Sequence, residues 1–317
     1  MSGISDLARW LAAASDVAVV THVHPDGDAL GTSGALVRAL TRMGKRAACL
    51  CDDPAPHNLA FLPVEVYQPE NVPFAPRYVL VCDAGSEDRI GRCAGLLSSA
   101  DGAATLDHHG TSQGIGDVRV IDGGAAATGV LALALIHELG VEPDRDMAAL
   151  LYAAVATDTG NFSFRNTNPA AMRAAAECLE AGIDLDDMNF RLFRARRMQK
   201  TRLIGAAIDG MSFLMEGRLA VIRVDRAMLN RCGAQSEDID TIVNFGMDTE
   251  GVQVSMLIEQ RGDAVKASLR SRGDIDVAAL AKKLGGGGHK NAAGATLEGT
   301  MAEVETLLVR MIGEILE

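Results

Sequence analysis

Apolar residues alternate along the first 160 residues between short strand-like runs and longer helix-like runs. The strand-like runs are "VAVVTH" (17–22), "RAACLC" (46–51), "YVLVCD" (78–83) and "AATLDHH" (103–109). Between the first two lies "ALVRALTRMG" (35–44), whose Leu36, Leu40 and Met43 share one helical face before Gly44. Strands alternating with helices predict an α/β domain with a mostly parallel sheet covered by helices.

The segment from 127 to 182 predicts three further helices. "ATGVLALALIHELG" and "DMAALLYAAVATDTG" read as buried helices, and "NPAAMRAAAECLEAG" begins with a cap residue, Asn168, and Pro169. The pattern then changes. "NFRLFRARRMQKTRL" (189–203) is a basic helical stretch that suits a connection between domains. Its basic face fits a plain solvated helix and a substrate-facing role equally well.

The last hundred residues predict a smaller α+β domain. "MSFLMEGRLAVIRVD" (211–225) and "VQVSMLIEQRGDAVKASLRSRG" (252–273) alternate around glycine turns, as antiparallel hairpins do. A helix, a four-glycine loop, a strand and a terminal helix follow. We therefore expect a catalytic domain over 1–186, a linker helix over 187–205 and a second domain over 206–317, with a cleft between the two domains.

Acids and histidines stand where these predicted elements end. They are His22, Asp26 and Asp28 in "HVHPDGD", Asp83 in "VCDAG", Asp107, His108 and His109 in "LDHHG", and Asp158 in "ATDTGNF". If the strands are adjacent and parallel, their carboxyl ends converge on one edge, where α/β proteins bind ligands. Pro25 and Gly27 are expected to keep the first motif out of a helix, so that Asp26 and Asp28 point in different directions.

A divalent metal centre follows from the residue types. Imidazoles and carboxylates without thiolates suit Mn²⁺, Mg²⁺, Fe²⁺ or Co²⁺ better than structural Zn²⁺. Five gathered carboxylates without a lysine would repel one another unless cations lay between them. Two metal ions a few ångströms apart would relieve this repulsion and would serve hydrolysis at phosphorus. His57 and His137 lack such neighbours and are expected to be structural, whereas His24 stays open.

Composition limits the partners and the compartment. The formal charge of −12 argues against a protein that coats long duplex nucleic acid, although many of the acids are ordinary surface residues. No run of apolar residues is long enough for a membrane span, and the N-terminus lacks the pattern of an export signal. The six scattered cysteines indicate neither a disulfide framework nor a zinc site. We expect a soluble, cytoplasmic protein.

The motifs together resemble those of a known family. "HVHPDGDALG", "CDAGSEDRIG", "DHH" and "TDTGNFSFRNT" resemble, in order and spacing, the four motifs of the DHH phosphoesterases, and "GGGGHKNAAG" resembles the signature of their DHH-associated C-terminal domain. The short chain is similar to the stand-alone branch that acts as nanoRNase and pAp phosphatase. Thr32, Ser112 and Ala127 depart from common family residues, and none of them is expected to touch a proposed metal ligand.

The resemblance implies a role for each site residue. His22 and Asp26 would bind one metal ion, Asp28, His108 and Asp158 the other, and Asp83 would bridge both, with Mn²⁺ favoured and Mg²⁺ or Co²⁺ as options. Asp107 would orient the first histidine of its motif, and His109 would face the substrate phosphate. The substrate-binding residues it implies are His109, Ser268, Arg270, Gly286, Gly287, Gly288 and His289. A glycine run alone is more often a flexible turn.

The function expected from this resemblance is hydrolysis of very short RNA or DNA oligonucleotides to mononucleotides, together with removal of the 3′-phosphate of pAp. Hydrolysis of a linear signalling dinucleotide, pGpG or pApA, is an alternative that uses the same site. A pyrophosphatase is less favoured. A non-catalytic nucleotide-binding protein is the alternative from another class, and the intact set of ligands argues against it. A homodimer is compatible with the sequence.

Overall fold

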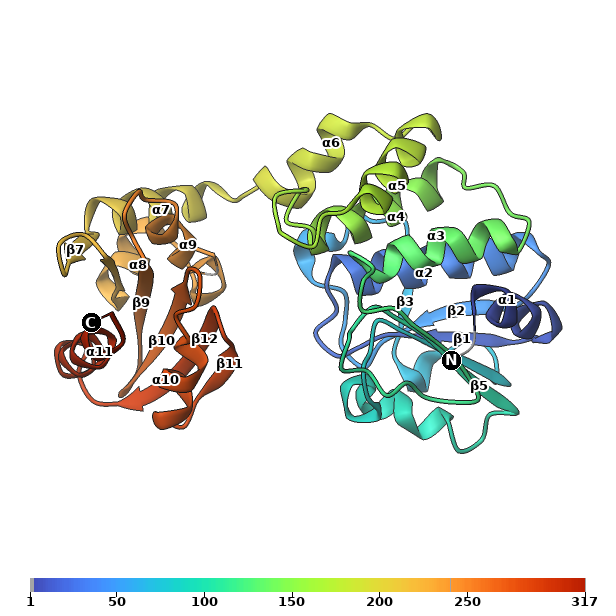
Figure 1. The fold of residues 1–317 in the computed structure, drawn as a ribbon, viewed down its shortest axis with the longest axis horizontal. Helices are drawn as coiled ribbons and strands as arrows, with labels where there is room; N and C mark the ends of the chain where they lie inside the picture. Colours follow the sequence, from blue (N-terminus) through green and yellow to red (C-terminus); the bar gives the residue numbers. More distant parts are fainter. Residues whose placement is uncertain (1–2, 240, 317) are drawn as a thin grey trace. The chain divides into compact units, whose positions relative to one another are not determined.

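The computed structural model describes residues 3–239 and 241–316, and the chain divides into two compact units. The first unit ends at Ala195 and the second begins at Arg196. Figure 1 shows a strand-and-helix arrangement in each of them. Among the helices that the structure describes, none combines the length and the apolar character that a membrane-spanning helix needs.

The first unit is built on a parallel sheet with the strand order β3-β2-β1-β4-β5-β6. Its strands are β1 (Val17–Val20), β2 (Ala47–Leu50), β3 (Val66–Tyr67), β4 (Tyr78–Cys82), β5 (Gly102–Asp107) and β6 (Val118–Ile121). Every neighbouring pair runs parallel. The α/β class predicted from the sequence is confirmed, and the short strands β3 and β6 are additions to it.

Helices cover one face of this sheet (Figure 1). Helices α1 (Ile4–Ala13), α2 (Gly27–Arg42) and α3 (Thr128–Glu138) pack on alternate strand residues such as Val17, Val19 and Leu80. Helix α4 (Arg145–Asp158) packs on α2 and α3, and α5 (Pro169–Glu180) packs on α3 and α4. The opposite face, with Ala18 and Val79, is covered by the 3-10 segment η3 (Glu87–Leu96) and by loops. Two further 3-10 turns are η1 (His57–Leu59) and η2 (Pro69–Asn71).

Helix α2 begins earlier than the sequence suggested. Asp26 is its N-cap and accepts a 3.0 Å hydrogen bond from the Ala29 amide, so Gly27 and Asp28 are already helical. Gly27 is required for a different reason from the one expected: a Cβ there would lie 2.4 Å from the Thr157 hydroxyl of α4. Asp26 and Asp28 still point in different directions, because a cap residue and a residue of the first turn face different sides.

The helix predicted over 187–205 is interrupted in the structure. Helix α6 (Leu185–Asn189) continues into a π-helical turn, η4 (Phe190–Arg194), and helix α7 (Met198–Asp209) begins only after Ala195 and Arg197 have turned extended. The Arg197 guanidinium is held by Asp238 at 3.0 Å and by Glu237 at 2.6 Å, which fixes the start of α7. The basic stretch is therefore two helical pieces and not one rod.

The second unit is an α+β domain, as predicted, around a sheet with the order β11-β12-β10-β9-β8-β7. Its strands are β7 (Ser212–Leu214), β8 (Leu219–Val224), β9 (Val254–Arg261), β10 (Ala264–Ser271), β11 (Gly287–His289) and β12 (Ala292–Glu298). The expected purely antiparallel pairing is wrong for β8 and β9, which run parallel. The chain crosses between them through α8 (Arg226–Cys232), η5 (Ser236–Ile239) and α9 (Val243–Met247), and parallel neighbours need such a crossover.

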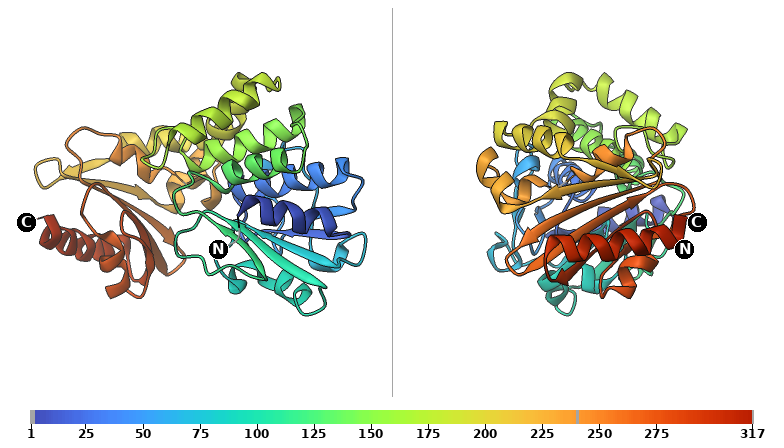
Figure 2. Two further views of the ribbon diagram at one scale, coloured as in Figure 1. Left: turned by 45° about the vertical axis from the view of Figure 1, so that its right-hand side comes forward. Right: turned by 90° about the vertical axis from the view of Figure 1, so that its left-hand side faces the viewer.

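Both faces of the second sheet carry helices. Helices α10 (Val277–Lys283) and α11 (Met301–Leu316) pack on Val265, Ala267 and Leu269, and Figure 2 shows α11 lying along this sheet. Helices α7 and α8 and the segment around α9 pack on the other face over Ile222 and Leu257. Two of the four glycines predicted to form a loop, Gly287 and Gly288, instead belong to the edge strand β11.

Candidate metal centre

The predicted site residues of the first unit come together at the carboxyl edge of its sheet. His22 lies just beyond β1, Asp83 directly follows β4, and His108 directly follows β5. These three strands are neighbours in the order β1-β4-β5 and run parallel, so their ends meet. Helix α2 supplies Asp26 and Asp28 from its start, and α4 supplies Asp158 as its last residue.

Three overlapping groups of donor atoms result, each with its atoms within 4.8 Å of one another. They are His22, Asp26 and Asp83; Asp28, His108 and Asp158; and Asp83, His108 and His109. Asp83 belongs to two of the groups, as does His108. The structure thus brings together all six residues for which the sequence predicted metal ligation.

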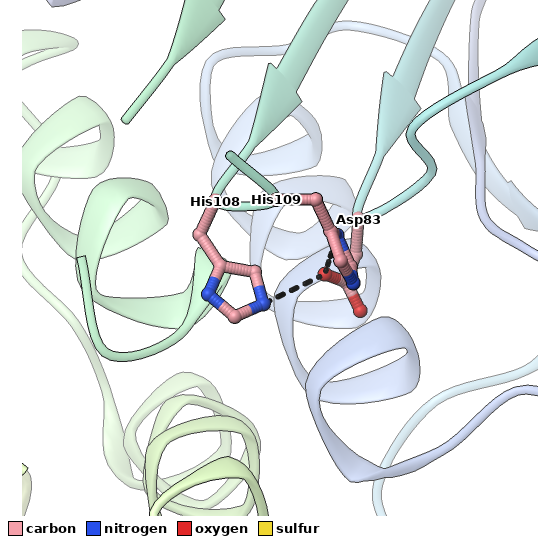
Figure 3. Close-up of side chains that lie close together, drawn as sticks. All are labelled: Asp83, His108 and His109. Atoms are coloured by element: carbon pink, nitrogen blue, oxygen red, sulfur yellow. Dashed lines mark ion pairs between the residues drawn. The ribbon is translucent and has the colours of Figure 1, made fainter. Parts of the chain in front are cut away.

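The Asp83 carboxylate lies between His22 on one side and the adjacent pair His108 and His109 on the other. Its Oδ2 is 3.6 Å from His22 Nε2, whereas its Oδ1 is 3.6 Å from His108 Nε2 and 3.7 Å from His109 Nδ1. Figure 3 shows both rings of the histidine pair directed at this carboxylate. Asp83 itself has a left-handed backbone, φ +56°, which only a few per cent of non-glycine residues adopt. The local chain is thus shaped to place one carboxylate between two donor groups.

His22, which is buried, and His108, which is partly buried, both present Nε2 to the cluster. His22 Nδ1 contacts the Val23 carbonyl at 2.8 Å, and His108 Nδ1 contacts the Ala125 carbonyl at 3.3 Å. A ring that donates Nδ1–H to a carbonyl keeps the lone pair of Nε2 for another partner, which is the usual arrangement of a metal-binding histidine.

The donor atoms are spaced for an ion and not for hydrogen bonds. The nitrogen–oxygen separations within the groups run from 3.4 Å, for His108 and Asp158, to 3.8 Å, for His22 and Asp26. Hydrogen bonds are shorter, about 2.7–3.2 Å. Two ligands that each bind one small divalent ion at about 2.1 Å lie between about 3 Å apart, at a right angle, and about 4.2 Å apart, on opposite sides of the ion. The residues present therefore fit a metal ion better than they fit one another.

The charge of the cluster also calls for cations. Burial raises the pKa of Asp28 well above its usual range, and the carboxylates of Asp83 and Asp158 add to the effect. Burial likewise raises the pKa of Asp158 to about 6, although His108 opposes the shift. Gathered carboxylates whose pKa values rise lack compensating positive charge.

Asp28 has a structural contact that sequence reasoning missed. Helix α3 has an alanine, Ala127, at its N-cap, so no side chain of its own can accept from its first amides. The Asp28 carboxylate does so from α2: it accepts from the Thr128 amide at 2.6 Å and from the Gly129 amide at 2.9 Å. The Thr128 hydroxyl in turn donates to Asp83 Oδ1 at 2.8 Å. The sequence did signal that this buried helix needs a cap from elsewhere, because its own cap residue is an alanine, but it did not identify Asp28 as the source.

Asp28 also contacts a residue that was expected to touch no proposed metal ligand. The Thr32 hydroxyl donates to Asp28 Oδ1 at 2.9 Å, so that expectation is wrong for Thr32.

Asp107 was expected to orient His108, and this expectation is wrong because Asp107 contacts a different histidine. Asp107 does not contact the first histidine of its motif; its Oδ1 is 2.8 Å from His109 Nδ1 and also accepts from the His109 amide. The second histidine is therefore the one that Asp107 orients, because the two adjacent rings leave the chain in different directions. His109 is half-exposed, and the hydrogen bond with Asp107 raises its pKa.

His24 lies outside the three groups. Its ring is 88% exposed and pairs with Asp53 at 2.9 Å. His137 pairs with Glu177, away from the cluster. All six cysteines are free and buried.

Four of the six substrate-binding residues predicted in the second unit share one face of its sheet, whereas Gly288 faces the opposite side and Gly286 precedes β11. Ser268 of β10 is opposite Gly294 of β12, which is opposite Gly287 of β11. Two residues along, Arg270 is opposite Ala292, which is opposite His289. Directly opposed residues of antiparallel strands point to the same side. The in-register neighbours of these residues are Gly294, Ala292 and Gly287, which have small side chains or none. Ser268, Arg270 and His289 therefore border a part of the sheet surface that carries no large side chain.

The glycines of this edge differ in what they allow. A Cβ at Gly286 would lie 2.1 Å from the Gly294 carbonyl oxygen, and one at Gly288 would lie 2.5 Å from the Ala292 carbonyl oxygen, so strand packing excludes side chains there. A Cβ at Gly287 would meet nothing within 4 Å. Gly287 thus leaves the exposed face of the edge strand bare.

The fold and this donor set define an α/β protein whose side chains at the carboxyl edge of its sheet fit divalent metal ions. Residues 16–155 match the DHH family, N-terminal domain, and residues 218–317 match the DHHA1 domain. A curated relative from Thermus thermophilus, named bifunctional oligoribonuclease and PAP phosphatase NrnA, is 37% identical over 89% of this chain and 84% of its own length. The chain belongs to the DHH family.

Two solved structures share the fold. An exopolyphosphatase-related protein from Bacteroides fragilis matches 98% of this chain and 95% of its own with a TM-score of 0.88 at 24% sequence identity. The exonuclease RecJ bound to manganese matches 100% of this chain and 95% of its own with a TM-score of 0.57 at 17% identity.

Proposed function

We propose that the chain is a phosphohydrolase, dependent on two divalent metal ions, that degrades very short oligonucleotides to mononucleotides and removes the 3′-phosphate of pAp. The observation that carries this proposal is the Asp83 carboxylate, whose two oxygens face two separate donor groups. Paired ions that share a carboxylate are a common device for displacement at phosphorus. The T. thermophilus relative, with its name of oligoribonuclease and PAP phosphatase, supports the substrate class.

The ligands divide between the two ions as the three groups suggest. His22 and Asp26 would hold one ion, Asp28, His108 and Asp158 would hold the other, and Asp83 would bridge them. Imidazole and carboxylate donors are compatible with Mn²⁺, the ion that the family resemblance implies, and with Mg²⁺ or Co²⁺ as options. When bound, the ions supply positive charge to the phosphate oxygens and lower the pKa of a water molecule.

The remaining side chains of the centre act on the substrate. His109 is half-exposed and is fixed by Asp107, so its ring is available to a phosphate oxygen of the substrate. Asp107 is a positioning residue, because it is fully buried and reaches the site only through His109.

The second unit would hold the terminal nucleotide. Arg270 offers a guanidinium for a phosphate, and Ser268, His289 and the bare backbone at Gly287 offer hydrogen-bonding groups on the same face. We assign catalysis to residues 1–186, the connection to 187–205 and substrate binding to 206–317.

The net charge of the chain and its cysteines bear on its substrates and its compartment. The formal charge of −12 disfavours binding of long duplex nucleic acid. The six free, buried cysteines suit a reducing cytoplasm.

The experiment is a substrate panel for EDTA-treated protein supplied with Mn²⁺. It contains 5′-labelled dinucleotides including pGpG and pApA, a 24-mer, pAp and pyrophosphate. We expect mononucleotides from the dinucleotides, loss of phosphate from pAp and little cleavage of the 24-mer. Tight nucleotide binding without turnover of any substrate would contradict the enzymatic function, and turnover of pGpG or pApA alone would favour the signalling dinucleotides.

A further inference from the structure

The loop that follows Asp158 presents an aromatic ring and a guanidinium that no role above uses. Phe164 is 61% exposed, which among the large apolar side chains that the structure describes is second only to Met198. Its neighbour Arg165 is exposed and makes no hydrogen bond or ion pair within residues 3–239 and 241–316. An exposed ring beside a free cation is the combination with which proteins bind single-stranded nucleotides.

This loop is held in place and tied to Asp158. The Asn166 side-chain amide donates to the Asp158 carbonyl and to the Ala126 carbonyl, both at 3.0 Å. The Phe164 amide donates to the Thr159 carbonyl at 2.9 Å, and Thr159 is fully buried. The exposed ring therefore stands on a structured turn beside a candidate metal ligand.

The backbone of the turn is shaped around the ring. Gly160 has φ +55°, and a Cβ there would lie 2.4 Å from atoms of the Phe164 ring, so the ring packs against bare glycine backbone. The next residues, Asn161 and Phe162, also have left-handed φ values, +53° and +62°. Such conformations in non-glycine residues cost free energy and concentrate at functional sites. Gly160 is two residues from Asp158, so their Cα atoms lie at most about 7 Å apart.

We infer that Phe164 stacks on the nucleobase of the nucleotide whose phosphate occupies the metal centre, and that Arg165 binds a phosphate of the same substrate. This inference rests on the proposed function and names a base-binding subsite on the catalytic unit itself. Arg165 lies close in sequence to Asp158 yet pairs with none of the clustered carboxylates, which leaves it free for an anion. Stacking on a phenylalanine tolerates any base, so this subsite would not select sequence.

The test measures the binding of AMP and of ribose 5-phosphate, which lacks the base, to the Mn²⁺-loaded protein by calorimetry. We expect Phe164→Ala to weaken AMP binding about 5- to 100-fold, the range for loss of one stacked base, and to leave ribose 5-phosphate binding unchanged. Phe164→Trp should retain AMP affinity. Phe213→Ala is the matched control, because Phe213 of the second unit is 49% exposed and has no such role.

Arg165 has its own expected signature. Arg165→Ala should weaken AMP and ribose 5-phosphate alike and should reduce the dependence of AMP binding on salt. The KM for a dinucleotide should rise in both alanine variants, while kcat changes less.

The outcomes separate this inference from the proposed function. Wild-type protein that cleaves dinucleotides and binds AMP, while Phe164→Ala retains wild-type affinity, overturns the base-binding subsite alone. An Arg165→Ala variant with unchanged affinity for both ligands overturns the assigned role of Arg165. Wild-type protein that neither cleaves dinucleotides nor binds AMP overturns the proposed function, and this inference with it.

Discussion

Oδ2 of the Asp83 carboxylate faces His22, whereas Oδ1 faces His108 and His109, so one side chain joins the donor groups of the site. Acids and histidines at the ends of neighbouring strands predicted that His22, Asp83 and His108 would meet, and they do. The partner of Asp107 was not predictable in the same way. Two adjacent histidines beyond a strand leave the chain in directions set by local backbone angles, and no residue pattern fixes those angles.

The hydrogen bond between Asp107 and His109 gives a prediction at the scale of one residue. Asp107→Asn removes the carboxylate that holds the His109 ring at 2.8 Å, so kcat for a dinucleotide should fall about 10- to 100-fold with little change in KM. The matched control is Asp101→Asn, because Asp101 is an exposed partner of Arg77. Wild-type kcat in Asp107→Asn would show that the orientation of His109 does not matter.

The titration of His22 gives a second prediction, for the metal-free protein. Burial alone would lower the pKa of His22, but the contacts with Asp26, Asp83 and the Val23 carbonyl together raise it from 6.5 to about 10. Between those values the folded state holds a proton that the unfolded state releases, so stability should fall as pH rises. The slope should reach about 1.4 kcal/mol per pH unit at most.

Thermal unfolding of EDTA-treated protein at pH 7 and pH 9 measures this slope. Wild-type protein should lose stability over this range, whereas His22→Gln should lose much less. Asp158, whose pKa is raised to about 6, contributes in the same direction but at lower pH, between about 4 and 6. Equal losses in wild-type and His22→Gln proteins would exclude His22 as the source.

At the scale of elements, the close contact between α2 and α4 positions the cluster, because Asp28 begins one helix and Asp158 ends the other. Gly31 of α2 lies against the backbone of α4: a Cβ there would be 2.3 Å from the Leu150 carbonyl oxygen and 2.9 Å from the Ala154 Cβ. Backbone atoms cannot rotate away as a side chain can. The two helices must therefore separate if residue 31 gains a methyl group.

Gly31→Ala should lower the free energy of unfolding by about 1–3 kcal/mol, as overpacking of a core does. Because α2 would shift, dinucleotide turnover should also fall. Gly95→Ala is the control, since a Cβ at Gly95 meets nothing within 4 Å, and it should change stability by no more than about 0.5 kcal/mol. Denaturant unfolding of both variants makes the measurement, and equal stabilities would mean that α2 and α4 tolerate a wider spacing.

Most elements followed from hydrophobic alternation, and the exceptions have physical reasons. Strands β3 and β6 are short and only partly buried, so their sequences carry little pattern. The parallel pairing of β8 with β9 depends on a crossover made of three short helical segments, none of which has a clear amphipathic period. The Asp28 carboxylate at the start of α3 joins residues 100 positions apart, and the alanine cap of α3 shows only that a partner is needed, not which residue supplies it.

At the scale of the whole molecule, catalysis is assigned to the first unit and binding of the terminal nucleotide to the second. The sheet face that carries Ser268, Arg270 and His289 belongs to the second unit, which contains none of the predicted metal ligands. Substitutions in the second unit are therefore expected to raise KM for the substrate more than they lower kcat.

Arg270→Ala should raise the KM for dinucleotides about tenfold or more, because it removes a charged donor to phosphate, and kcat should change less. The matched control is Arg231→Ala, an exposed arginine of α8 on the same unit. Steady-state kinetics on one dinucleotide makes the measurement. Unchanged KM in Arg270→Ala would remove this residue from the substrate-binding face.

The central claim is that the donors around Asp83 bind two divalent ions and that these ions are required to cleave a short oligonucleotide. The most direct measurement titrates Mn²⁺ into EDTA-treated protein and follows both the ions bound per chain and the release of mononucleotide from a dinucleotide. Wild-type protein should bind two ions and become active as the second binds, and Asp83→Asn should bind fewer ions and release at most about a hundredth as much product. Cleavage by the metal-free protein would contradict the requirement for metal ions. Cleavage by the Asp83→Asn variant at the rate of the wild-type protein would contradict the role of Asp83 in binding them.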